Sequence, residues 1–142
     1  MAHPTELILT KLEVATAQLE RALVLFLNES DLVSSVTLAG ASEEILGKLL
    51  EQCGKKHALS SRVEATVEIA RIIQNREANP KAFATLANEV CNGLKHIADG
   101  QPVTVTCKAS IDIIGRAVEN YFALTDSLSP SMSQFLQVAY AR

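Results

Sequence analysis

A lysine and a histidine stand side by side in NEVCNGLKHIADG, residues 88–100, about one turn before Gly100. Histidine exchanges protons near neutral pH, and lysine supplies a positive charge. At about 100° per residue, Glu89, Asn92 and His96 fall together on one side of a helix. Two interpretations stay open: these residues form the solvated polar flank of a helix, or they line a cleft or a dimer seam.

The apolar residues of the same segment decide which side the histidine takes. Asn79 followed by Pro80 predicts a helix start, and the helix ends near Ala98. Its apolar stripe is spaced four, three, four, three and comprises Phe83, Ala87, Val90, Leu94 and Ile97. His96 lies more than about 100° from the centre of this stripe. The pattern therefore places His96 on a second face, outside the core.

An earlier predicted helix carries two glycines. It begins after Asp31 or Ser34, which can cap free backbone N–H groups, and it runs to Cys53 before a stop at Gly54. The expected core stripe is Leu38, Ala39, Ser42, Ile45, Leu46, Leu49 and Cys53, and the opposite side holds Thr37, Gly40, Glu44 and Gly47.

The two glycines call for a physical reason. Each costs about 1 kcal/mol against alanine, so Gly40 and Gly47 indicate a backbone that something approaches closely. The simplest occupant is a second copy of the chain, with Glu44 near its polar groups. The alternative is chance flexibility.

The remaining segments also favour helices. We expect helices over 5–28, over 62–76 behind a capping box of Ser61 and Glu64, over 108–125, and from Pro130 onward with Met132, Phe135, Leu136 and Ala139 inward. Residues 102–106 alternate β-branched side chains but have no second strand to pair with, which predicts an extended connector. The fold class is therefore all-α: a single domain over 1–142, built as a compact antiparallel bundle of four to five main helices plus a short C-terminal helix.

Composition excludes several classes of function. A net charge of −3 over 142 residues gives no general attraction to polyphosphate. The three cysteines are widely spaced and odd in number, which favours reduced thiols and a cytoplasmic location. No apolar run is long enough to cross a membrane, and no metal-ligand or phosphate-loop spacing is present, so we expect no membrane contact, metal or cofactor.

Several stretches together resemble a group of uncharacterised bacterial all-helical proteins related to the HEPN superfamily. They are residues 18–59, NEVCNGLKHIADG, and ENYFALTDSLSPSMSQFL at 119–136. The resemblance implies a HEPN-like helical bundle and a homodimer, and active members of the superfamily are metal-independent ribonucleases. In those members a histidine exchanges protons with the RNA, while an arginine four to six residues before it holds the phosphate.

Carried onto this chain, the resemblance gives His96 the catalytic position and Asn92 the position after the arginine. Cys91 stands where the arginine is expected, and a thiol cannot hold a phosphate as a guanidinium does. Lys95 is the nearest replacement, although it points about 100° away from His96.

Three functions remain in view. The first is a noncatalytic, dimeric interaction or nucleotide- or ligand-binding module, whose ligand or interface cleft contains Glu44, Thr37, Gly40, Gly47 and Glu89. The second is a toxin-like ribonuclease with His96, Asn92 and Lys95 at its catalytic site and RNA as its partner. The third is a helical bundle that binds a small ligand in its interior.

Overall fold

The computed structural model describes residues 2–73, 77, 79–95 and 100–141. This part of the chain is helical and contains no strand, which confirms the all-α prediction. The helices are α1 (Lys11–Asn28), α2 (Leu32–Gln52), α3 (Ala58–Ile73), α4 (Pro80–Ala87), α5 (Glu89–Lys95), α6 (Cys107–Thr125) and α7 (Pro130–Tyr140). None of the described helices is both long and apolar enough to pass through a membrane.

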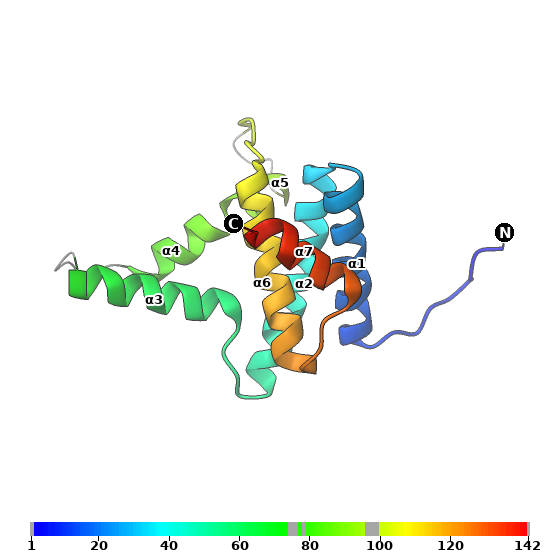
Figure 1. The fold of residues 1–142 in the computed structure, drawn as a ribbon, viewed down its shortest axis with the longest axis horizontal. Coiled ribbons are helices and arrows are strands. Elements are labelled where there is room, and N and C mark those ends of the chain that lie inside the picture. Colours follow the sequence, from blue (N-terminus) through cyan, green and yellow to red (C-terminus); the bar gives the residue numbers. More distant parts are fainter. Residues whose placement is uncertain (1, 74–76, 78, 96–99, 142) are drawn as a thin grey trace.

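Three long helices, α1, α2 and α6, form the core (Figure 1). A short connection turns the chain between α1 and α2, and Asp31 caps α2 by accepting a 3.0 Å hydrogen bond from the Ser34 N–H. This N–H bond lowers the pKa of Asp31. The cap lies at one of the two positions that the sequence predicted.

The helix directions only partly match an antiparallel bundle. α1 runs against α2, but α2 and α6 run the same way (Figure 1). The Asn120 side chain donates to the Glu43 carbonyl, and Lys55 beyond the end of α2 donates to the Ala123 carbonyl, so residue numbers rise in the same direction along both helices. Parallel neighbours need a long crossover, and α3, α4 and α5 supply it. Of these, α3 and α4 project from the core as a hairpin (Figure 1).

Two predicted helix starts were wrong. α1 begins at Lys11 rather than near residue 5, because Thr10 and Glu13 form a reciprocal capping box. α3 begins at Ala58 rather than 62, and Glu64 pairs with Lys56 instead of closing a box with Ser61. In both cases the helix begins after a residue whose side chain accepts a hydrogen bond from a backbone N–H of the first turn: Thr10 for α1 and His57 for α3. The apolar pattern does not mark either boundary.

The helix predicted from Pro80 to Ala98 is interrupted at Asn88. Asn88 caps the C-terminus of α4, and α5 follows at once from Glu89. Val90 and Leu94 of the predicted stripe are half-buried against the core, whereas Cys91 is the one fully buried residue of α5. Ile97 lies outside the described residues.

The last helix packs as predicted. Met132 and Phe135 of α7 are fully buried, and Leu136 and Ala139 are partly buried against the same core. The ring of Phe135 meets the ring of Phe26 edge to face at a centroid distance of 5.8 Å, which fixes α7 across α1. The framework that carries α5 and the start of α3 is therefore α1, α2, α6 and α7.

Candidate functional site

A surface cleft of about 350 Å³ lies where α5 and the start of α3 meet α2. We call it the polar cleft. Its lining residues are Gly40, Glu43, Glu44, Gly47, Lys48, Glu51, His57, Leu59, Asn88, Cys91, Asn92 and Lys95. The volume lies in the range of small-molecule sites, and most of the lining is polar or charged.

The two glycines form the α2 side of the polar cleft. They were predicted on an outer face, which is wrong, since both are buried. A Cβ on Gly40 would lie 2.9 Å from the Cys91 sulfur, and a Cβ on Gly47 would lie 3.5 Å from the His57 ring. A close approach does occur, as the sequence indicated, but the approaching groups are α5 and His57 of the same chain.

The cleft gathers most of the residues that the sequence singled out. Asn92 and Lys95 line it from α5, and Glu44 lines it from α2. Thr37 and Glu89 do not line it; the Thr37 hydroxyl donates to the Val33 carbonyl of its own helix. His96 lies outside the described residues.

The rim of the cleft carries charges of both signs. Glu44 Oε1 lies 3.2 Å from Lys48 Nζ, and Glu44 Oε2 lies 4.0 Å from Lys95 Nζ. All three side chains are substantially exposed, so each pair contributes little to stability. Two lysines thus share the carboxylate of Glu44 at this edge of the cleft.

His57 closes another side of the cleft. Its Nδ1 accepts a 3.2 Å hydrogen bond from the Ser60 N–H, which caps α3, and its Nε2 lies 3.0 Å from Glu51 Oε1. Because Nδ1 accepts from a backbone N–H, the proton of the neutral ring sits on Nε2 and points to Glu51. The ring is thereby fixed against Gly47.

Glu43 is the buried carboxyl group of the cleft, with only 9% of its surface exposed. No hydrogen bond to its carboxylate occurs within the described part of the chain. Burial raises the pKa of Glu43, and the positive charge of Arg116 offsets this only in part. The cleft therefore presents a largely desolvated acceptor to anything that enters it.

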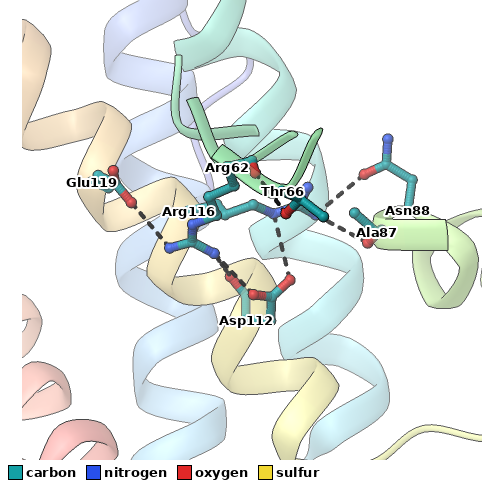
Figure 2. A network of polar contacts seen from close by, with 7 residues as sticks. All are labelled: Arg62, Thr66, Ala87, Asn88, Asp112, Arg116 and Glu119. Atoms are coloured by element: carbon teal, nitrogen blue, oxygen red, sulfur yellow. Dashed lines mark hydrogen bonds and ion pairs between the residues drawn. The ribbon is translucent and has the colours of Figure 1, made fainter. Parts of the chain in front are cut away.

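Behind the cleft, Arg116 of α6 is 1% exposed. Its Nη2 donates to the Asn88 side-chain oxygen at 3.2 Å and to the Ala87 carbonyl at 3.3 Å. Its Nε lies 3.8 Å from Asp112 Oδ2. Figure 2 shows Asp112 contacted by both Arg116 and Arg62, and Arg62 also reaches Glu119. This network ties α3, α6 and the α4–α5 junction together.

Cys91 is a buried thiol rather than a nucleophile. Burial raises its pKa, and the charges of Arg116 and Lys95 lower it only in part. The thiol therefore stays protonated near neutral pH. All three cysteines are free; Cys53, expected in the core, and Cys107 are exposed. Among the described residues, no group of histidine, cysteine and acidic side chains is arranged to hold a metal ion.

Sequence reasoning missed Glu43, Asn88 and Arg116. A partial signal existed for Arg116, because Asp112, Arg116 and Asn120 recur every four residues within an otherwise apolar face. Nothing in the sequence indicated that Glu43 is buried, since the adjacent Glu44 is the same residue type and is exposed. Asn88 was hidden inside a continuous helical pattern.

Comparison of the chain with protein-family models, with curated proteins and with solved structures found no match. Function must therefore be inferred from the chain's own residues.

Proposed function

We propose that the chain is a HEPN-like, noncatalytic binding module that takes a nucleotide-sized polar ligand in the polar cleft. The observation that carries this proposal is Glu43, which lines the cleft with 9% of its surface exposed and whose carboxylate accepts no hydrogen bond from the described residues. A ligand that donates hydrogen bonds to this carboxylate would offset the cost of its partial desolvation. The charged rim would then select among ligands of suitable size.

Two features favour binding over catalysis. Cys91 stands where an active HEPN ribonuclease is expected to have its arginine, and its raised pKa keeps it neutral. Arg116 lies close by but is 1% exposed and is bonded to Asn88 and Ala87, so it is not available to a phosphate from solvent. Without such a cation a phosphoryl transition state typically loses several kcal/mol of stabilisation.

Ligand binding is tested by thermal unfolding in the presence of nucleoside monophosphates and amino acids. At least one compound should raise the midpoint, because a ligand that binds only the folded state stabilises it by mass action. Asn92→Trp fills the cleft from an exposed position and should abolish the effect. Glu89→Trp, on the same helix but outside the cleft, is the matched control. If no compound stabilises the protein, the proposed binding function is wrong. If Asn92→Trp responds like the wild type, the ligand does not bind in the polar cleft.

The second candidate function is a ribonuclease. Asn92 and Lys95 favour it, because both line the polar cleft. His96 directly follows Lys95 in the sequence. The test is RNA cleavage by protein purified free of contaminating nuclease. Cleavage that His96→Ala abolishes would establish the ribonuclease and reject the noncatalytic module.

We also propose a homodimer in the bacterial cytoplasm. The three free cysteines support a reducing compartment. The dimer is supported by the α3–α4 hairpin, where Ile69, Ile72 and Leu86 are each more than half exposed. Apolar side chains gathered on a projecting element are typical of an interface.

A further inference from the structure

The polar cleft combines features that together restrict the chemistry of its ligand. Glu43 offers two carboxylate oxygens, and within the described residues neither accepts a hydrogen bond. An ionised carboxylate only accepts hydrogen bonds, so a group with two neighbouring N–H donors satisfies both oxygens at once. Guanidinium cations and the edges of some nucleobases carry such a pair of donors.

Asn88 adds a donor to the same cleft. Its side-chain oxygen accepts from Arg116 Nη2 at 3.2 Å. Arginine is always a donor, so this contact fixes the oxygen toward Arg116 and leaves the amide N–H₂ of Asn88 to serve the cleft. The lining therefore presents two acceptor positions on Glu43 and a donor on Asn88.

The donor on Asn88 distinguishes a nucleobase from a guanidinium cation, which has no acceptor to offer it. Lys48 and Lys95 stand at one edge of the cleft, where both contact the carboxylate of Glu44. Their ammonium groups can bind a phosphate at this edge. The ligand should accordingly donate hydrogen bonds at one end and carry negative charge at the other.

Resting on the proposed binding function, we infer that the polar cleft recognises a guanine nucleotide. The guanine N1–H and exocyclic amino group donate to the Glu43 carboxylate, and the guanine O6 accepts from the Asn88 amide. Adenine, cytosine and uracil lack two adjacent N–H donors on this edge. The phosphate lies at the rim, toward Lys48 and Lys95.

Isothermal titration calorimetry with GMP, AMP, guanosine and inorganic phosphate tests this inference. GMP should bind at least about tenfold more tightly than AMP, which is the discrimination expected of one good bidentate pair. GMP should also bind more tightly than guanosine, and Lys48→Ala together with Lys95→Ala should remove that advantage while leaving guanosine binding intact. Inorganic phosphate binding as tightly as GMP would overturn base recognition.

Two conservative variants separate base recognition from folding. Glu43→Gln keeps the side-chain size but replaces one acceptor by a donor, and it should abolish the preference for GMP. Asn88→Asp keeps an acceptor for Arg116 but loses the amide donor, and it should weaken GMP at least about tenfold. Both variants should keep the wild-type circular dichroism spectrum. If either folds normally and retains the full GMP preference, the inference is wrong.

The outcomes also distinguish this inference from the proposed function. Equal binding of GMP and AMP, abolished by Asn92→Trp, would overturn guanine recognition and leave the ligand-binding module in place. Stabilisation by an amino acid but by no nucleotide would do the same. Absence of binding by every compound tested would overturn both.

Discussion

Glu43 and Arg116 place opposite charges inside the protein without forming an ion pair among the described residues. Arg116 is neutralised from the other side by Asp112 and is hydrogen-bonded to Asn88. The Glu43 carboxylate accepts no hydrogen bond from the described residues, so the effect of burial dominates and raises its pKa from 4.5. A carboxyl group with a raised pKa in the folded state holds its proton at a pH where the unfolded chain has lost it.

This difference gives stability a defined pH dependence. The contribution of Glu43 is fully present below the unfolded pKa of 4.5 and is lost as pH rises through the folded pKa. Urea unfolding of the wild type and Glu43→Gln across this interval should therefore show the wild type losing free energy of unfolding relative to the variant. Glu44→Gln, an exposed neighbour, controls for the loss of one charge. A wild-type to Glu43→Gln difference that stays constant with pH would contradict the assignment.

At the scale of single residues, sequence reasoning recognised groups whose chemistry is local. The Asp31 cap was predicted because its acceptor serves an N–H only three residues away. Arg116 and Glu43 were missed because periodicity assigns polar residues to the outside of a helix. Their burial depends on α5 and α6, which come from distant parts of the sequence.

Among the elements, α2 shows how close packing against neighbouring segments can require glycine within a helix. Gly40 and Gly47 occupy the same side, seven residues apart, yet they face different neighbours. The sequence predicted the close approach because unneeded glycines are costly in a helix. The sequence could not identify the residues that approach these glycines, since Cys91 lies 51 positions further along the chain than Gly40.

The two glycines should respond in opposite ways to alanine. Both substitutions gain about 1 kcal/mol of helix propensity. Gly47→Ala meets His57 at an ordinary 3.5 Å and should stabilise the protein by up to about 1 kcal/mol, whereas Gly40→Ala would stand 2.9 Å from the Cys91 sulfur and should destabilise it by about 1–3 kcal/mol. Urea unfolding measures both.

A second substitution tests the physical cause. Cys91→Ala removes the sulfur and leaves its Cβ 3.6 Å from a Cβ at Gly40, which is normal contact. Gly40→Ala should therefore cost much less stability in the Cys91→Ala background than in the wild type. Equal costs in the two backgrounds would show that the α2–α5 contact is not what requires glycine.

Element existence was easier to predict than element boundaries. Strong apolar periodicity located the segments that became α1, α2, α6 and α7. The start of α1 was misplaced because Ile8 continues the apolar spacing, whereas the Thr10–Glu13 capping box makes the helix begin at Lys11. At the break between α4 and α5, the Asn88 side-chain oxygen accepts a hydrogen bond from Arg116, a residue distant in the sequence whose contact local propensity cannot indicate.

At the scale of the whole molecule, the parallel arrangement of α2 and α6 has a structural consequence. The chain must travel back along the bundle between them, and it does so through α3, α4 and α5 (Figure 1). Arg62 binds α3 to α6 through Asp112 and Glu119, but the far part of the hairpin extends beyond the core. Its apolar side chains therefore remain uncovered within one chain.

The proposed dimer follows from that exposure and can be tested through Ile69 and Ile72. They lie three residues apart on α3, so they share one helix face, and each is more than half exposed. Replacing both by glutamate should convert dimer to monomer in sedimentation velocity, because burying two carboxylates against an apolar partner is costly. Val138→Glu, at a similarly exposed position on α7, should leave the dimer intact. A wild-type protein that sediments only as monomer at high concentration would contradict the dimer, and a dimer that survives the double substitution would place its interface away from this face of α3.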